Sequence, residues 1–446
     1  MMKSLLSIVL LGCLAAAPLH AQTFPGEPVG DVIPPGWVLP PRAAKVAPNT
    51  KVALLAAKIL TAAENGPQVI DRGVLVIDGR TIRAIGKQGE VEIPEGFTVM
   101  DLGDQWLMPG MVELHAHVAG TFDINDTVFL TNPGLRVSTA VVPENSNLVR
   151  AVAGGVTSML FIPGSGSNMG GQGVLLKTAL PHYEQMEVRN PGSLKLAQAG
   201  NPERFAWGVN RSFMNWNTRD TFERGIAYAN EWIAFGDGKG PKPEVNLQFE
   251  VFRWLVPKIA QVSTHTQIYQ VVQESLEVVV KELKMPLFID HGTIGGWKTG
   301  EMVRDLGVAA IIGPRNVDTP MSWFIGWAQN MHHEGFRGVV AGYQERGVTQ
   351  LGFNTDSPVV PQEELQYQAS MAVRFGMVDD ALQTVRGLTI IPARTANIND
   401  RVGSLEVGKE ADILVITGHP ADPRSSVERV WIEGSQVYNA EDKRVY

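Results

Sequence analysis

Short apolar runs alternate with helical patterns through the middle of the chain. Between 268 and 283, for example, apolar residues recur at the spacing expected of a helix that covers a parallel sheet. Eight strand–helix repeats predict a (β/α)8 barrel of the TIM type over residues 109–396, with functional side chains at the carboxyl ends of its strands. A doubly wound open sheet is the alternative, but no glycine-rich phosphate turn follows the first run. The eight runs are 111–117, 156–163, 173–177, 194–199, 259–265, 286–291, 308–313 and 351–356.

A second pattern, short apolar runs separated by hairpin turn signals, occupies both ends of the chain. It fills residues 51–108 and returns after residue 403. The closing runs are too few to form a stable sheet alone. We therefore predict a composite β-sandwich, formed by residues 51–108 and 397–446, beside the α/β barrel.

The first 21 residues have the three parts of a secretory signal peptide. Lys3 supplies a positive start, an apolar run of about a dozen residues follows, and Ala21 is a small residue at the cleavage position. This run is too short to cross a bilayer, and no later run is long enough, so we expect no transmembrane segment. Residues 22–50 are rich in proline, which favours an extended arm. We expect an exported protein, periplasmic or secreted.

The single cysteine, Cys13, offers an alternative to cleavage after Ala21. Residues 10–13 (Leu-Leu-Gly-Cys) also resemble a lipobox, in which a lipidated Cys13 would anchor the protein. One cysteine excludes a disulfide framework, a thiolate zinc cluster and a thiol catalytic centre. A net charge of −8 argues against nucleic acid as a partner, because no surplus of Lys and Arg neutralises phosphates. Nothing in the sequence predicts the oligomeric state.

Histidines and an aspartate end several of the predicted strands. His115 and His117 end the first, and because residues i and i+2 of a strand point to one side, both imidazoles can bind one metal. His265 ends the fifth strand, His291 the sixth and Asp356 the eighth. Imidazoles with a carboxylate suit zinc or a similar transition metal. The absence of thiolates favours a catalytic over a structural metal.

Four segments resemble motifs of the amidohydrolase superfamily. They are 107–117 (LMPGMVELHAH), 289–292 (IDHG), 354–358 (NTDSP) and 403–412 (GSLEVGKEAD), and the resemblance covers nearly the whole mature chain. It is closest to the imidazolonepropionase-like and prolidase-like branch, some members of which hydrolyse dipeptides. The resemblance implies a (β/α)8 barrel beside a composite β-sandwich.

The resemblance also implies one or two zinc ions, with Mn²⁺ or another divalent transition metal as alternatives. Lys177 is an alternative to Lys195, either as the lysine that bridges the two metals or as a contact to a substrate carboxylate. Glu113 stands where the family usually has Asp, and a longer carboxylate could shift the orientation of the ligands. The ligands that the resemblance assigns are His115, His117 and Asp356 for the first metal, His265 and His291 for the second, and Lys195, carboxylated, as the bridge.

The activity implied is hydrolysis of an amide or peptide bond of a small substrate, such as a dipeptide or an N-acyl amino acid, by a metal-bound hydroxide. Asp356 would orient the hydroxide, take its proton and deliver it to the leaving nitrogen. One alternative is a mononuclear deaminase or cyclic-amidine hydrolase of the same fold. The resemblance implies a His-x-x-Glu or His-x-x-Gln motif at the fifth strand of such members, but this chain has Ile268 at the third position after His265. The other is a non-catalytic scaffold, which is expected to lose ligands, whereas every ligand position here is filled.

Overall fold

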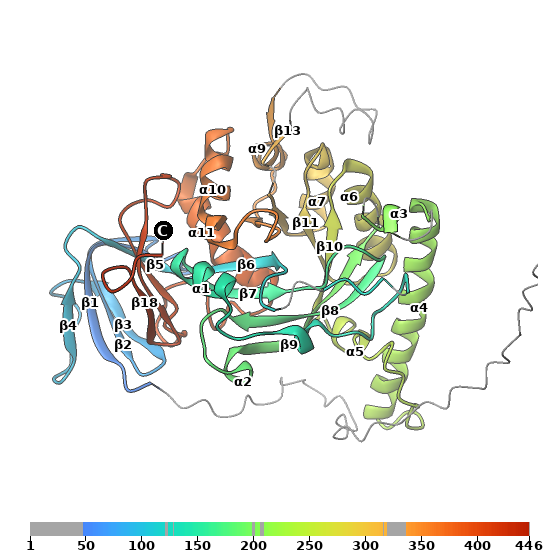
Figure 1. Cartoon of the computed structure of the whole chain (residues 1–446), viewed down its shortest axis with the longest axis horizontal. Helices are drawn as coiled ribbons and strands as arrows, with labels where there is room; N and C mark the ends of the chain where they lie inside the picture. Colours follow the sequence, from blue (N-terminus) through green and yellow to red (C-terminus); the bar gives the residue numbers. More distant parts are fainter. Residues whose placement is uncertain are drawn as a thin grey trace, which may run out of the picture.

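The computed structural model describes residues 48–445 except 121–123, 128, 199–200, 206–208, 315 and 319–335 (Figure 1). The predicted signal peptide, Cys13 and residues 22–47 of the predicted arm lie outside the described residues. Among the helices of the described part, none combines the length and the apolar character that crossing a membrane requires.

Eight strands form the sheet of the barrel, and each overlaps one of the eight predicted runs. Along the sheet they follow the order β15-β12-β11-β10-β9-β8-β7-β6. The last and first strands meet where the backbone of Ala116 bridges to Ser357 and the backbone nitrogen of His117 donates to Ser357 O at 2.9 Å. The strands are Met111–Ala116 (β6), Val156–Phe161 (β7), Met169–Lys177 (β8), Glu187–Ala197 (β9), Gln261–Thr266 (β10), Leu287–His291 (β11), Ala310–Ile312 (β12) and Leu351–Phe353 (β15).

One strand departs from the expected uniform series of strand–helix repeats. β8 pairs antiparallel with both β7 and β9, whereas the other neighbouring pairs in this sheet are parallel. Residues 162–168, which join β7 to β8, are too few for the crossover helix that a parallel pair requires. The eight-stranded barrel is confirmed, but the prediction that every strand is parallel and followed by a helix is wrong at β8.

Helices surround the sheet and cover its outer face. The long helix α4 lies at the right-hand edge of Figure 1. Phe222 and Trp232 of α4 belong to the same buried cluster as Val262 of β10 and Ile289 of β11. The helices are Ser146–Ala153 (α1), Tyr183–Met186 (α2), Asn201–Phe205 (α3), Arg211–Gly236 (α4), Phe252–Leu255 (α5), Tyr269–Ser275 (α6) continued by a π-helix at Leu276–Glu282, Gly300–Asp305 (α7), Val339–Gln344 (α9), Leu365–Arg374 (α10), Gln383–Leu388 (α11) and Ile390–Thr395 (α12).

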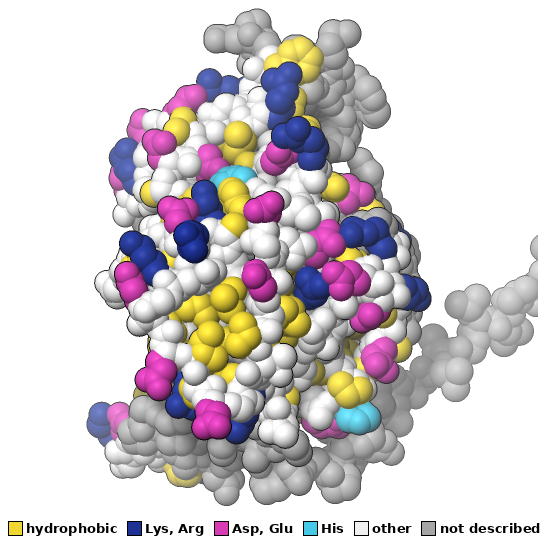
Figure 2. All heavy atoms as spheres, turned by 90° about the vertical axis from the view of Figure 1, so that its left-hand side faces the viewer, with side chains coloured by type: hydrophobic (Ala, Val, Ile, Leu, Met, Phe, Trp, Pro, Cys, Tyr) yellow, Lys and Arg dark blue, Asp and Glu magenta, His cyan; other side chains and the backbone are white. Residues whose placement is uncertain are grey.

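Strands from both ends of the chain lie in one further sheet, at the left of Figure 1. Its order is β18-β17-β16-β5-β1-β2-β3, with β4 also paired to β1, and the two ends meet where β16 pairs antiparallel with β5. The two-layered packing of a sandwich stays a prediction. Figure 2 shows this side of the molecule, with a patch of hydrophobic side chains among charged ones. The strands are Lys51–Leu60 (β1), Val69–Asp78 (β2), Thr81–Lys87 (β3), Thr98–Asp101 (β4), Trp106–Pro109 (β5), Ile413–Ile416 (β16), Val427–Ile432 (β17) and Ser435–Asn439 (β18).

The alternation of side chains along β6 positions the first histidines. Residues at odd positions, Glu113 and His115, lie on the side opposite to Val112 and Leu114, because successive side chains of a strand point to opposite faces. Val112 and Leu114 pack in a buried apolar cluster that includes Ala393 of α12. Burial of these apolar residues therefore fixes the register that turns the histidine side of β6 toward the site.

Candidate metal centre

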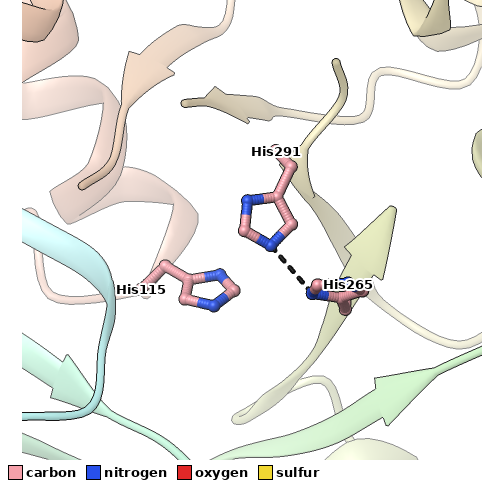
Figure 3. Close-up of side chains that lie close together, drawn as sticks. All are labelled: His115, His265 and His291. Carbon is pink, nitrogen blue, oxygen red and sulfur yellow. Dashed lines mark hydrogen bonds between the residues drawn. The ribbon is translucent and has the colours of Figure 1, made fainter. Parts of the chain in front are cut away.

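The side chains predicted at the strand ends meet at one end of the barrel. His115 Nε2 lies 3.2 Å from Asp356 Oδ1, and His117 Nε2 lies 3.3 Å from the same oxygen. Across the cluster, His291 Nε2 lies 2.9 Å from His265 Nδ1. Figure 3 shows His115 facing this pair from another strand.

Two groups of potential ligand atoms overlap in this cluster. One consists of His115, His117 and Asp356, and the other of His115, His265 and His291; in each, the ligand atoms lie within 4.8 Å of one another. The first group contains the residues that were predicted for one metal, and the second contains the pair predicted for another. His115 belongs to both, which the sequence did not indicate.

Lys195 lies against this cluster from β9 and is completely buried. Its Nζ atom is 3.3 Å from His115 Nε2 and 3.7 Å from Asp290 Oδ2. Burial lowers the pKa of Lys195, although the Asp290 carboxylate attracts the proton. The neutral amine is therefore more accessible here than on an exposed lysine.

Oxygen acceptors face the Nδ1 atoms of three of the four histidines. His117 Nδ1 lies 2.9 Å from Ile162 O, and His291 Nδ1 lies 2.8 Å from Gly313 O. Since a carbonyl oxygen only accepts, Nδ1 carries the proton in both rings. His115 Nδ1 likewise faces the Asp290 carboxylate at 3.2 Å. The Nε2 atoms of these three rings are thus directed into the cluster.

His265 has the opposite orientation. Its Nδ1 atom faces the cluster, 2.9 Å from His291 Nε2, and also lies 2.9 Å from Ser165 Oγ. Its Nε2 atom is buried and has no hydrogen-bond partner among the described residues. Nδ1 is therefore the nitrogen through which His265 can act as a ligand.

The pKa values keep most of these rings neutral. Burial lowers the pKa of His117, and burial together with His115 lowers that of His291 to about 4. The pKa of His265 falls well below its usual value, because the ring is buried and lies beside His291. Neutral imidazoles with inward lone pairs are the form that binds metals.

Charge concentrates instead on His115 and Asp356. Burial and nearby Lys195 disfavour a charged His115. Its pKa is nevertheless raised, because the carboxylates of Asp290 and Asp356 attract the proton. Burial also disfavours the charged form of Asp356, but His115 and His291 hold its pKa below the usual range. Asp356 is therefore an anion that needs a positive neighbour.

Left-handed backbone at two strand ends brings extra side chains into the cluster. His291 has φ 71° and Asp356 has φ 50°, conformations that are uncommon outside glycine. In a regular strand Asp290 and His291 would point to opposite faces, yet Asp290 Oδ2 lies 3.2 Å from His115 Nδ1 while His291 also faces the cluster. Asp290 is not predicted from the sequence, because alternation along a strand allows only one of two neighbouring side chains to face the site.

Glu113 joins the first strand to the turn that carries Asp356. Its carboxylate accepts from the backbone nitrogen of His115 at 3.0 Å, and from the backbone nitrogen and hydroxyl of Thr355 at 3.0 and 2.9 Å. Complete burial raises the pKa of Glu113 to about 8. Glu113, which stands where the resemblance leads one to expect Asp, thus holds together β6, which carries His115, and the turn that carries Asp356.

A cavity of about 470 Å³ opens onto the cluster. His117, His265, His291 and Asp356 form one part of its wall. The remainder combines polar residues with apolar ones: Asn125, Ser165, Asn201, Gln267 and Thr293 on the one hand, and Ile124, Ile294, Pro314, Pro358 and Val359 on the other. No lysine or arginine is among the described residues that line it. A molecule the size of a dipeptide fits such a volume.

Lys177 lies outside this site. Because β8 is antiparallel, its last residue is paired with Ser158, near the start of β7 and at the end of the barrel opposite the cluster. Lys177 Nζ forms ion pairs with Asp412 Oδ2 at 2.7 Å and Glu410 Oε2 at 2.8 Å. The prediction of Lys177 as a bridge or a substrate contact is therefore wrong; it connects the barrel to the terminal segment.

Comparisons with known proteins agree with the fold. A model of the amidohydrolase family matches residues 330–437. Amidohydrolase tasK of Hapsidospora irregularis is 24% identical over 407 residues, which are 82% of this chain but 40% of that protein, so this chain spans less than half of its length. An amidohydrolase from Thermotoga maritima MSB8 is 25% identical, with a TM-score of 0.75 over 87% of this chain and 100% of that one. A putative prolidase from Bifidobacterium longum is 17% identical, with a TM-score of 0.52 over 88% and 95% of the two chains.

Proposed function

The chain belongs to the amidohydrolase superfamily, and we propose that it is a metal-dependent hydrolase that cleaves an amide or peptide bond of a small substrate. The observation that carries this proposal is the pair of overlapping donor groups, joined by His115, on the wall of a substrate-sized cavity. Amide hydrolysis needs a strong nucleophile and a polarised carbonyl, and such a centre can supply both.

The donor atoms of the cluster fit divalent transition metals. The neutral imidazoles of His117, His265 and His291 direct lone pairs into one space beside the anionic Asp356, an arrangement that favours a bound cation. Asp290 adds a buried carboxylate, whose Oδ2 atom lies 3.2 Å from His115 Nδ1 and 3.7 Å from Lys195 Nζ. Nitrogen and carboxylate oxygen donors suit Zn²⁺, and Mn²⁺ less closely. We propose that His115, His117 and Asp356 hold one ion, and His265 and His291 a second.

Lys195 completes this proposal as the bridging ligand. An ammonium group would repel two cations, whereas a carboxylated lysine offers two anionic oxygens. Carboxylation needs the neutral amine as the nucleophile toward CO₂, and burial lowers the pKa of Lys195 in that direction. Its Nζ atom already lies 3.3 Å from His115 Nε2, between the strands that carry both groups of ligands.

The bound metal would supply Lewis acidity, which lowers the pKa of water toward neutrality and polarises the substrate carbonyl. Asp356 would act as the proton carrier, because it is ionised and lines the cavity. It would accept a proton from the attacking water and deliver it to the leaving nitrogen. The carbonyl oxygens of Ile162 and Gly313 would keep the His117 and His291 rings in one tautomer throughout.

We propose a dipeptide or an N-acyl amino acid as the substrate. The cavity volume and its mixed polar and apolar wall suit a molecule of this size, and similarity to a putative prolidase supports a peptide bond as the target. A panel of dipeptides and N-acetyl amino acids, supplied with zinc or manganese, tests the proposal. Hydrolysis of at least one member would support it. Release of ammonia from a purine or pyrimidine, with no amide hydrolysed, would replace it with the deaminase alternative.

We also propose that the protein works outside the cytoplasm. The signal-like residues 1–21 and the proline-rich residues that follow support export, to the periplasm or the medium. Cell fractionation tests this proposal, and retention of the full-length chain in the cytoplasm would contradict it. Substitution Cys13→Ser separates cleavage after Ala21 from lipidation, because it releases the protein from membranes only if Cys13 is the anchor.

A further inference from the structure

We propose that Ser165 is a further catalytic residue, whose hydroxyl donates a hydrogen bond to the oxygen of the scissile carbonyl as negative charge develops there. This inference rests on the proposed hydrolysis and adds to it a group that neither the motifs nor the predicted ligands include. Ser165 lies in the connection between β7 and β8, lines the cavity, and is 7% exposed. Its Oγ atom lies 2.9 Å from His265 Nδ1.

Side-chain hydrogen bonds hold the connection that carries Ser165 in place. Asn125 Oδ1 accepts a hydrogen bond from the backbone nitrogen of Gly166 at 2.9 Å. A Cβ atom at Gly164 would lie 2.3 Å from the same oxygen, so only glycine lets Asn125 approach this closely. Ser167 Oγ donates to Met169 O at 3.2 Å, which fixes the far end. The loop thus presents one hydroxyl to the cavity in a fixed position, and preorganised donors of this kind stabilise developing charge.

The protons that His291 and His265 carry determine where the hydroxyl proton of Ser165 can point. His291 uses its Nδ1 proton on Gly313 O, so its Nε2 atom has only a lone pair to offer. If His265 is also a ligand through Nδ1, its own proton must reside on Nε2, the nitrogen without a partner. His265 Nδ1 then neither donates to Ser165 nor offers it a lone pair. The hydroxyl proton of Ser165 is left to point into the cavity.

The position of this hydroxyl matches a role toward substrate oxygen. With the attacking water at Asp356, a carbonyl oxygen that lies toward the second group of ligands would come within reach of Ser165 Oγ, which lies beside His265 of that group. Serine stays neutral throughout, so no proton leaves it. Removing one such donor from a preorganised site typically lowers kcat by about 10²- to 10³-fold.

The test compares Ser165→Ala with Ser167→Ala, a serine of the same loop whose hydroxyl bonds to backbone and does not line the cavity. In the zinc-loaded full-length protein, we expect Ser165→Ala to lower kcat by about 10²-fold or more on the best dipeptide of the panel, with KM changed less than threefold. A phosphonamidate analogue of that dipeptide should bind more weakly by a similar factor. Zinc affinity, measured by titration of the metal-depleted protein, should stay unchanged, and Ser165→Thr should recover part of kcat.

Each of three results would overturn the proposal. An unchanged kcat in Ser165→Ala, with an active wild type, would overturn the role of Ser165 alone. A weaker zinc affinity in Ser165→Ala, with activity restored by excess zinc, would show that Ser165 only positions His265 and would overturn the donor role as well. A wild-type protein that binds zinc but hydrolyses no amide would overturn the proposed function, and the role of Ser165 with it.

Discussion

Glu113 and Thr355 are 242 positions apart in the chain, yet the Glu113 carboxylate accepts two hydrogen bonds from Thr355. One comes from the backbone nitrogen at 3.0 Å and the other from the hydroxyl at 2.9 Å. The contact connects β6, which carries His115, to the turn that carries Asp356. The two ends of the barrel sheet are thus joined by a side chain directly beneath the proposed ligands.

Shortening this carboxylate should misplace the ligands. Glu113→Asp keeps the carboxyl group but loses one methylene of reach, so we expect the bonds to Thr355 to weaken and kcat to fall more than KM rises. Glu113→Ala leaves three buried donors unpaired and should lower the free energy of unfolding by about 2–4 kcal/mol. Steady-state kinetics and denaturant titration measure the two effects. Wild-type kcat and stability in Glu113→Asp would contradict this role.

Removing Lys177 should destabilise the protein without changing its chemistry. Lys177→Met leaves the buried Asp412 without its cation and Glu410 with Arg401 alone, which should cost about 3–5 kcal/mol near pH 7. The folded variant should keep the wild-type kcat, because Lys177 lies at the opposite end of the barrel. A loss of kcat in a variant that is folded and metal-loaded would contradict this placement.

The same substitution has a predictable pH dependence. Burial disfavours charge on Glu410, yet Lys177 and Arg401 hold its pKa below the usual range. A lowered carboxylate pKa stabilises the fold above the unfolded-state value of about 4.5, and this contribution is lost as the pH falls further. The stability difference between wild type and Lys177→Met should therefore shrink as the pH is lowered through this range. A difference that stays constant from about pH 4.5 down to about pH 2 would contradict the ion pair as its cause.

Replacing Lys195 should remove one metal. Lys195→Ala cannot form the proposed bridge, so the metal content should fall from about two ions per chain to about one, with loss of most of the activity. Reconstitution of the wild type with zinc should also be slower in buffer freed of CO₂. Metal analysis and activity recovery measure these effects. Full metal content and activity in Lys195→Ala would exclude the bridging role.

His265 should matter for metal affinity, whereas an exposed histidine should not. His265→Asn removes the Nδ1 ligand and should weaken binding of the second zinc by at least tenfold. His182, exposed at the start of α2, provides the matched control, and His182→Asn should bind zinc as the wild type does. Calorimetric titration of the metal-depleted proteins measures both. Equal affinities in the two variants would exclude His265 as a ligand.

Much of the fold and of the cluster follows from periodicity in the sequence. The two-residue alternation of a strand places His115 and His117 together, and the spacing of apolar runs places His265, His291 and Asp356 at the ends of later strands. These inferences hold because parallel strands end at the same edge of a barrel.

Local backbone and chain direction explain what the sequence did not predict. An apolar run has no direction of its own, so the reversal of β8, and with it the displacement of Lys177, could not be foreseen. Asp290 was missed because left-handed backbone at His291 breaks the alternation. Ser165 lies in an irregular connection, where serine between glycines usually indicates only a turn.

Stepwise return of zinc to metal-depleted protein, with hydrolysis of the best dipeptide or N-acetyl amino acid followed at each step, tests the metal dependence of the reaction most directly. We predict no hydrolysis without metal, and activity that rises with added zinc and levels off at about two ions per chain. Hydrolysis at the full rate by protein shown to contain no metal would contradict the central claim.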